Sequence, residues 1–255
     1  MLWNDFLREL DPALTEAYEA WNERSAQHID LAPKDRCLVL ASIDSVVGVE
    51  PLYLDKHIED AIEAGATVLE IAEAFVVASY YEGQQTIQRG AAALERVVAA
   101  RDAAGKSTRR KGNVCKPDTM KNKLGDRVWP HVFQRYDADL FRDYTRWLRR
   151  LEKHQELDYK TRELIIVGID SAVYWPEPFI DMHVVMAFDY GATIQELLET
   201  VVVAQSVRGV HPVNHGLNAI YRTVRALEVD GQPPRYRKDI AEPPMAGRWS
   251  VEFVE

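Results

Sequence analysis

The sequence predicts a helical protein built as two tandem repeats, and three observations support this prediction. The pattern His-x3-Ala-x3-Gly-Ala-Thr-x2-Glu starts at His57 and again at His183, 126 residues later, and self-similarity at a fixed offset indicates an internal duplication. Apolar residues recur at helical spacing in both copies. Each Gly-Ala-Thr-x2-Glu motif contains signals that end one helix and begin the next.

The duplication divides the chain into four parts. The first repeat covers residues 1–100 and the second covers 129–228, with about three in ten aligned positions identical. Residues 101–128 form a basic linker with nine basic and three acidic side chains. We expect a solvated tether there, with phosphate binding as the alternative. Residues 229–255 form a Pro-rich C-terminal arm, of a kind that often packs on a neighbouring subunit.

Composition restricts the class of protein. The net charge of −9 argues against nucleic acid as a partner. The two cysteines indicate neither a disulfide framework nor a thiolate metal site. No apolar run approaches the roughly 20 residues that span a bilayer, and the N-terminus lacks the pattern of a signal peptide. We therefore expect a cytoplasmic protein without membrane contact.

Each repeat begins with a segment of apolar and aromatic residues at helical spacing, 12–30 and 138–156. This spacing predicts a helix with one face in the core. His28 and His154 fall near that stripe, so we interpret both as core histidines, with a catalytic role as the alternative.

The following helices have recognisable first residues. Pro33 suits the first position of a helix, and Asp158 is an acceptable N-cap for the equivalent helix of the second repeat. The later Thr-x2-Glu motifs are capping boxes. Glu70 and Glu196 are thereby assigned to helix capping and removed from the catalytic candidates.

An aspartate occurs within a strongly apolar run in each of these helices, Asp44 in the first repeat and Asp170 in the second. Burying a carboxylate is costly unless it is paired or protonated. Each aspartate either bonds a helix end or a nearby serine, or is an acid/base group or metal ligand with a raised pKa. Glu163 lies seven residues before Asp170 on the same helix face. Its counterpart is Cys37, so the repeats are not chemically equivalent.

Four histidines are candidates for function. His57 and His183 each follow an aspartate by thirteen residues, and this repeated placement favours a functional role for His183. His211 and His215 occur only in the second repeat. Four residues apart, they share one helix face and could hold a divalent metal, although surface or capping roles are the alternative.

The chain resembles the carboxymuconolactone decarboxylase and alkylhydroperoxidase D-like family. The resemblance rests on Arg162-Glu-Leu, Pro176-Glu177, the His183 motif and the following Glu-Leu-Leu-Glu-x3-Val-Ala. It covers nearly all of both repeats and excludes the linker and the arm. It implies an all-α fold in which two alkylhydroperoxidase D-like units form a fused pseudo-dimer. It also implies a homo-oligomer, with a trimer favoured.

The peroxidase branch of that family uses Cys-x2-Cys-x3-His. The two cysteine positions hold Glu50 and Tyr53 in the first repeat and Pro176 and Phe179 in the second. Hydroperoxide reduction by thiols is therefore excluded as the predicted activity.

The leading hypothesis is an enzyme acting on a small oxygenated carboxylate by decarboxylation, isomerisation or a carbon–carbon lyase step. His183 would be the general acid/base, and Glu163 or Asp170 would orient it or take a second proton. Arg162 could hold the substrate carboxylate, with a helix-surface salt bridge as its alternative role, and the resemblance extends substrate binding to Glu177. This chemistry needs charge stabilisation and a proton donor but no cofactor.

Two alternatives remain open. A divalent metal (Zn, Mn or Fe) could be held by His183, His211, His215 and one of Glu163 or Asp170, and would act as a Lewis acid in a lyase or hydrolase. The other alternative is a catalytically silent assembly partner in which the duplicated core survives and the sites have decayed. The cysteine opposite Glu163 is consistent with such decay in the first repeat.

Overall fold

The fold is all-α, as predicted. The computed structural model describes residues 8–9, 11–27, 30–109, 137–151 and 154–229, and this part of the chain contains ten helices and no strand. The first repeat contains α2 (Pro12–Ala26), α3 (Pro33–Val47), α4 (Pro51–Glu63), α5 (Val68–Glu82) and α6 (Gln84–Ala103). The second contains α8 (Ala138–Leu151), α9 (Tyr159–Val173), α10 (Glu177–Asp189), α11 (Ile194–Arg208) and α12 (His211–Val229).

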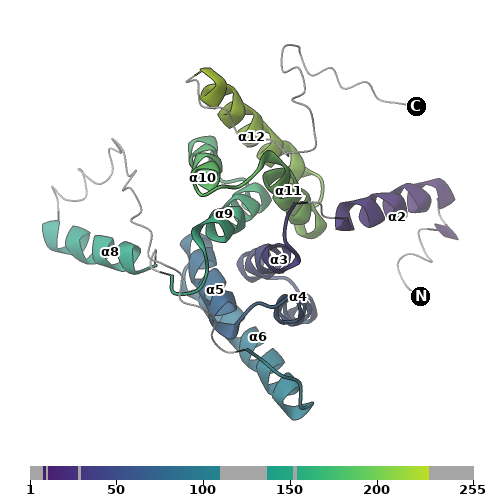
Figure 1. Ribbon diagram of the computed structural model, residues 1–255, viewed down its shortest axis with the longest axis horizontal. Helices are drawn as coiled ribbons and strands as arrows, with labels where there is room; N and C mark the ends of the chain where they lie inside the picture. The colour runs from purple at the N-terminus through teal and green to yellow at the C-terminus, as the bar shows by residue number, and fades with distance from the viewer. Residues whose placement is uncertain (1–7, 10, 28–29, 110–136, 152–153, 230–255) are drawn as a thin grey trace.

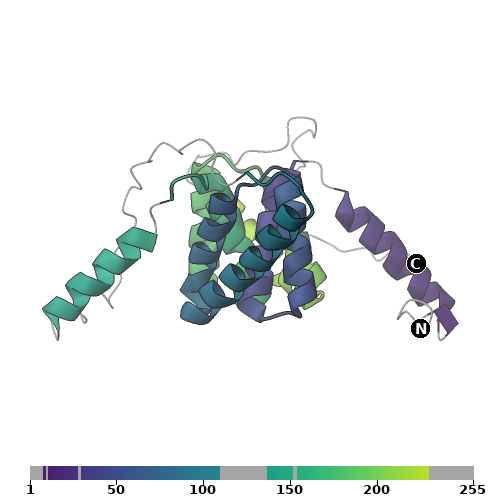
Figure 2. The ribbon, with the colours of Figure 1, turned by 90° about the horizontal axis from the view of Figure 1, so that it is seen from below.

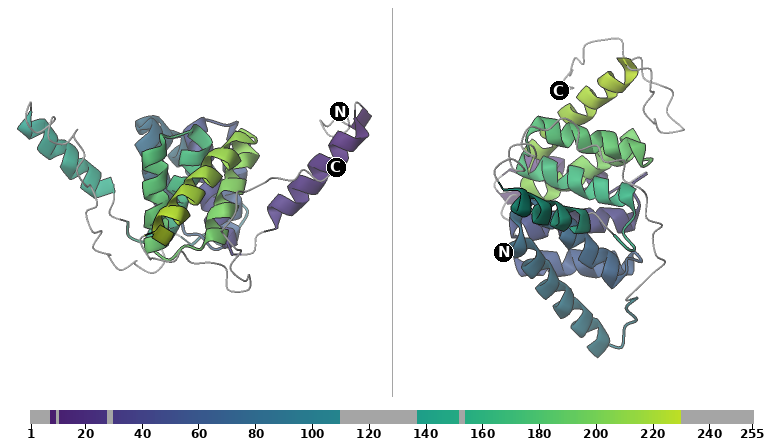
Figure 3. Two further views of the ribbon diagram at one scale, coloured as in Figure 1. Left: turned by 90° about the horizontal axis from the view of Figure 1, so that it is seen from above. Right: turned by 90° about the vertical axis from the view of Figure 1, so that its left-hand side faces the viewer.

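The two repeats interleave around a central helix pair. Helices α3 and α9 pack against each other in the middle of the bundle, with α4 beside α3 and α10 beside α9 on opposite outer sides (Figure 1). Helix α5 of the first repeat also packs on α9, and α11 of the second packs on α3. Each repeat thus covers the buried helix of the other, and α6 and α12 lie at opposite ends of the bundle (Figure 3).

The helix-start signals of the sequence are confirmed. Pro33 is the first residue of α3, and the Asp158 side chain caps α9 by accepting from the Thr161 amide at 2.9 Å. Both Thr-x2-Glu motifs form complete capping boxes at α5 and α11. Gly65 and Gly191, just after α4 and α10, have φ of 97° and 94°, a backbone conformation that favours glycine.

Two buried glutamates join the repeats. Glu73 on α5 accepts hydrogen bonds from the amides of Glu156 and Leu157, which precede α9, at 3.0 and 2.8 Å. Glu199 on α11 accepts in the same way from the amide of Leu31, before α3, at 2.7 Å. An unpaired buried amide is costly, so each repeat supplies hydrogen bonds that the other needs to bury its central helix.

The first helix of each repeat lies outside the bundle. Helices α2 and α8 extend from opposite sides of the bundle (Figure 2). Among the described helices, the main neighbour of α2 is α11, and their contact is small. Trp21 remains 40% exposed, although its indole N–H donates to Gln205 at 2.8 Å, and Trp147 is 49% exposed. The prediction that these aromatic stripes belong to the core is therefore wrong for the single chain, because periodicity identifies an apolar face but not what covers it.

Of the two histidines assigned to the core, His154 is buried, whereas His28 lies outside the described residues. Arg101 belongs to the last turns of α6 and donates to Glu59 at 2.6 Å, so this helix continues past the expected start of the linker. Residues 110–128 of that linker and 230–255 of the C-terminal arm lie outside the described part of the chain. None of the helices described has the length and apolarity required to cross a membrane.

Candidate active site

Three ionisable side chains are buried along α9, the central helix of the second repeat. Arg162, Glu163 and Asp170 are each at most 3% exposed. Most of the remaining residues of the helix are apolar, and it is covered by α3, α5, α10, α11 and α12. Because solvent does not reach these groups, the cost of burial and their partners within the protein together decide their protonation.

Glu163 connects a guanidinium to an imidazole. Its Oε2 lies 2.8 Å from Nδ1 of His183 on α10, and its Oε1 accepts from Arg162. Burial alone would raise the pKa of Glu163, but the Arg162 charge and the His183 hydrogen bond outweigh burial and lower this pKa. An ionised carboxylate can only accept, so Nδ1 donates and Nε2 is the ring nitrogen left to exchange protons with a ligand. The His183 side chain is 16% exposed, and its geometry suits a general base.

The location of Arg162 corrects one expectation. The sequence analysis gave a salt bridge on the helix surface as the alternative role of Arg162. In the structure Arg162 instead forms an ion pair with Glu163 in the interior. A charged side chain is buried here because its neighbour in sequence offers a carboxylate in the same environment. The predicted contact of Arg162 with a substrate carboxylate stays a prediction.

Asp170 is fully buried and holds a proton unusually well. Its Oδ1 accepts from the Tyr81 hydroxyl at 2.6 Å, whereas Oδ2 has no hydrogen-bond partner among the described residues. Burial raises the pKa of Asp170 to about 6, although the His183 charge and the Tyr81 hydrogen bond lower it. The expected bond to a helix end or a serine is therefore replaced by one to a tyrosine.

Tyr81 is a candidate site residue that sequence reasoning missed. It comes from α5 of the first repeat, and the equivalent position in the second repeat is Val207, so the duplication gave no signal for it. Burial and the nearby Asp170 raise the pKa of Tyr81 well above its usual value, which keeps the hydroxyl a donor. The ring of Trp175 meets the Tyr81 ring edge-on at 5.2 Å.

The turn from α9 to α10 has a strained backbone. Tyr174 has a φ of 57°, the only positive φ of a non-glycine residue in the described chain, and its counterpart is Gly48. A bulky residue rarely adopts this conformation. The rings of His211 and His215 lie 6.0 and 5.9 Å from the Tyr174 ring, and Nε2 of His215 donates to the Trp175 carbonyl at 2.8 Å. These two histidines thus support the turn.

The structure does not bring the proposed metal ligands together. Within the described residues, no three or more His, Cys, Asp or Glu side chains are grouped so that they could hold a metal ion. His183 is paired with Glu163, whereas His211 and His215 lie against Tyr174. The metal-dependent alternative stays a prediction, which elemental analysis of the purified protein would test.

Glu177 lies at the start of α10, away from the buried groups. Its side chain is 63% exposed and accepts from Arg222 at 3.1 Å. Arg222 also forms two hydrogen bonds with Asp181, at 2.9 and 2.7 Å. The substrate-binding role of Glu177 stays a prediction, and the structure shows it in a surface salt bridge.

The first repeat contains a related pair with a different acid. Nδ1 of His57 on α4 lies 2.5 Å from Oδ2 of Asp44, the counterpart of Asp170. His183, by contrast, is paired with Glu163, whose counterpart is Cys37. Both histidines are therefore fixed by a buried carboxylate, but from positions seven residues apart on the central helix.

Fold and site together define a duplicated all-helical protein with a buried carboxylate–histidine pair in each half. The chain belongs to the carboxymuconolactone decarboxylase family, whose model matches residues 12–96 and 138–221. A crystal structure from Burkholderia xenovorans LB400, provisionally described as a gamma-carboxymuconolactone decarboxylase subunit, has a similar fold, with a TM-score of 0.50 and 24% identity. The similarity covers 89% of this chain and 91% of that one. No curated protein matches the chain.

Proposed function

We propose that the protein is a cofactor-independent lyase or isomerase that acts on a small oxygenated carboxylate. The observation that carries this proposal is the proximity of a base and an acid in the second repeat. The Glu163 carboxylate orients His183 and leaves Nε2 free to accept a proton. Asp170 retains a proton up to a pH of about 6 and interacts with the charge of His183. Such a pair can remove a proton at one atom and supply one at another.

For a decarboxylation, the bond between the substrate and its carboxylate carbon breaks and carbon dioxide leaves. The electron pair passes into an adjacent carbonyl and forms an enolate, which a proton donor stabilises and then protonates. The His183 imidazolium, oriented by Glu163, would return the proton to the enolate carbon, and Asp170, held by Tyr81, is the buried acid that can supply or take a second proton. In an isomerisation, Nε2 of His183 would take the proton that Asp170 replaces.

The proposal includes a homo-oligomer, with a trimer favoured, and a cytoplasmic location. Helices α2 and α8 expose Leu14, Tyr18, Trp21, Leu140 and Trp147 on segments that extend from the bundle (Figure 2). Exposed aromatic side chains of this kind are typical of surfaces covered by another subunit. The two-cysteine composition fits a reducing compartment.

Steady-state assays of carbon dioxide release test the activity, with a carboxymuconolactone as the first substrate because the family bears that name. We expect His183→Ala to lower the rate by about 100-fold or more, because general acid–base groups contribute at least that much. The surface variant Glu95→Gln on α6 is the control and should match the wild type. Equal turnover by His183→Ala and the wild type would rule out this mechanism.

A further inference from the structure

We propose that the first repeat contains a second proton-transfer centre, formed by His57 and Asp44, which binds a small anion that carries a removable proton. This centre is chemically distinct from the one at His183, and its existence does not depend on activity there.

The geometry of a general base is complete in this centre. Oδ2 of Asp44 is within 2.5 Å of Nδ1 of His57, and the Asp44 side chain is 1% exposed. The buried carboxylate fixes the ring, and with Nδ1 donating, Nε2 is the nitrogen left to accept a proton. The His57 side chain is 22% exposed, slightly more than the 16% of His183, so a ligand can reach it.

The acid that pairs with the histidine differs between the repeats, and the residues at two equivalent positions differ with it. In the second repeat Glu163 is hydrogen-bonded to His183, and Asp170 accepts a hydrogen bond from Tyr81 instead. The first repeat has Cys37 at that position, so Asp44 is engaged by His57 instead. Val207 stands where the tyrosine would be. The first centre therefore has a base but lacks the second, proton-bearing acid, and suits a reaction in which one proton is removed and returned.

Arg36 is the residue of this repeat that could bind an anion. Arg36 is the counterpart of Arg162, whose charge is compensated by Glu163. Arg36 instead hydrogen-bonds Cys37, and its Nε is buried without a hydrogen-bond partner in the described chain. The Cys37 thiol also experiences the charges of Asp60 and Lys56 on α4, the helix of His57, and these two side chains form a salt bridge with each other. An arginine that is paired with no carboxylate of the described residues is suited to a ligand carboxylate.

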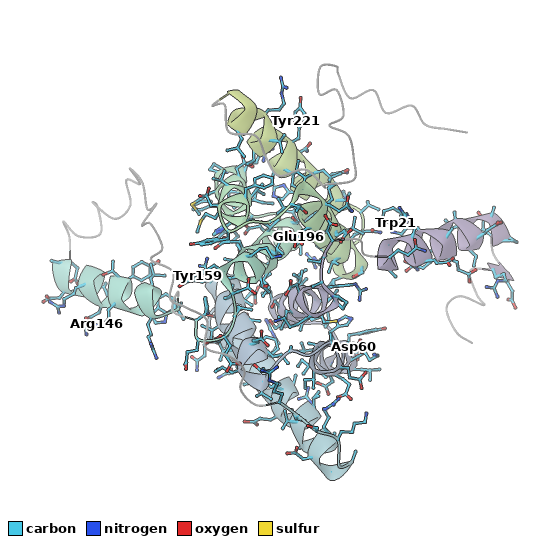
Figure 4. All side chains as sticks on the ribbon, in the orientation of Figure 1. Trp21, Asp60, Arg146, Tyr159, Glu196 and Tyr221 are labelled. Atoms are coloured by element: carbon cyan, nitrogen blue, oxygen red, sulfur yellow. The ribbon has the colours of Figure 1, made fainter. Side chains whose placement is uncertain are left out.

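The two centres lie on opposite sides of the bundle. Helix α4 is beside α3 and α10 is beside α9, with the central pair between them (Figure 1). Figure 4 marks the α4 side at Asp60, three residues after His57. One small ligand cannot contact both histidines, so we infer two sites of different chemistry.

The proposed step is a balanced proton transfer. Nε2 of His57 takes a proton from the ligand, the electron pair stays on the ligand as an enolate or alkoxide, and the imidazolium is stabilised by Asp44. The same imidazolium returns the proton, to the original atom or to a neighbouring one. A small carboxylate with an acidic C–H or O–H group is the class of ligand that fits.

Modification by diethyl pyrocarbonate at pH about 8, located by peptide mass spectrometry on the full-length chain, tests the base. We expect Asp44→Asn to slow modification of His57 about tenfold or more, because the amide favours the tautomer in which Nε2 carries the hydrogen. The rate at His183 should not change. Glu163→Gln is the matched variant and should slow His183 only. An unchanged rate at His57 in folded Asp44→Asn would overturn the proposal.

Malonate tests the anion site without relying on that variant. We expect malonate to protect His57 from modification in the wild type, and we expect Arg36→Gln to abolish most of this protection. Sulfate at equal ionic strength controls for screening. Absence of protection in the wild type, or equal protection in Arg36→Gln, would overturn the assignment of a carboxylate ligand to this centre.

Discussion

At the scale of single residues, two buried carboxylates of the second repeat have pKa values shifted in opposite directions by their surroundings. Glu163 has a lowered pKa because Arg162 and His183 outweigh the effect of burial. Asp170, seven residues later on the same helix, has a pKa raised to about 6 because burial dominates. Two acids whose environments move their pKa values apart can serve as an ionised orienting group and as a proton donor.

The raised pKa of Asp170 predicts a measurable pH dependence of stability. The folded protein binds the proton more tightly than the unfolded chain, so this stabilising contribution is complete below the unfolded value of 3.8 and is lost as pH rises through about 6. We expect Asp170→Asn to gain roughly 3 kcal/mol relative to the wild type between about pH 4 and pH 7. Urea unfolding at several pH values measures this difference.

His154 has a pKa shifted in the opposite direction, so its effect on stability has the opposite dependence on pH. Burial and the Arg162 charge lower its pKa to about 4 from 6.5. Its stabilising contribution is therefore present above the unfolded value and is lost as pH falls towards 4. His154→Gln should consequently gain stability relative to the wild type on acidification, by roughly 3 kcal/mol. If both variants followed the wild-type pH curve, the assigned pKa shifts would be wrong.

At the scale of helices, the bundle depends on the close approach of α3 and α9. A Cβ on Gly168 of α9 would lie 2.7 Å from Cγ1 of Val39 on α3, closer than side chains can tolerate without movement. Because α9 carries Arg162, Glu163 and Asp170, the position of this crossing also determines the position of the site.

We expect Gly168→Ala to lower the free energy of unfolding by about 1–3 kcal/mol through overpacking, despite the higher helix propensity of alanine. Chemical denaturation measures the change. Gly65→Ala is a control of another kind, since nothing lies within 4 Å of its added Cβ and only its φ of 97° opposes the substitution. Combining Gly168→Ala with Val39→Ala should restore part of the loss, and no recovery would argue against this contact as the cause.

Sequence alone was sufficient for most helix boundaries but not for the partners of the buried groups. Pro33, Asp158 and the two capping boxes act locally, so their effect could be predicted. Tyr81 reaches Asp170 from the other repeat, and no periodicity encodes a contact between segments so far apart. The hydrogen bond between His57 and Asp44 likewise depends on side-chain geometry, which the spacing of the residues in the sequence does not specify.

At the scale of the whole molecule, α2 and α8 extend from the bundle (Figure 2), and their aromatic side chains are exposed in the single chain. If these helices pack on neighbouring subunits, as we propose, removing an aromatic anchor should dissociate the assembly. We expect Trp147→Glu to reduce the molar mass measured by light scattering during gel filtration, from that of an oligomer towards that of one chain. The exposed Arg146→Gln on the same helix is the control (Figure 4). A Trp147→Glu protein with the wild-type mass would contradict this role for α8.

The whole molecule also explains why the duplicated chain is not two copies of one site. Each central helix is covered by a helix of the other repeat, so a change in α5 alters the environment of α9. The Tyr81 hydroxyl is such a change, because it gives Asp170 in the second centre a hydrogen-bond donor, whereas the counterpart of Tyr81, Val207, has no such group. Duplication followed by changes at this interface could therefore produce two sites of different chemistry.

The central claim is that Asp170 is a proton donor held beside His183 by a tyrosine of the other repeat. Titration of its side-chain carboxyl by ¹³C NMR, assigned by comparison with Asp170→Asn, tests this claim most directly. The account predicts a midpoint of about 6 in the wild type and a higher midpoint in Tyr81→Phe, because that hydrogen bond lowers the pKa of Asp170. A wild-type midpoint near the ordinary value of 3.8, unchanged in Tyr81→Phe, would contradict it.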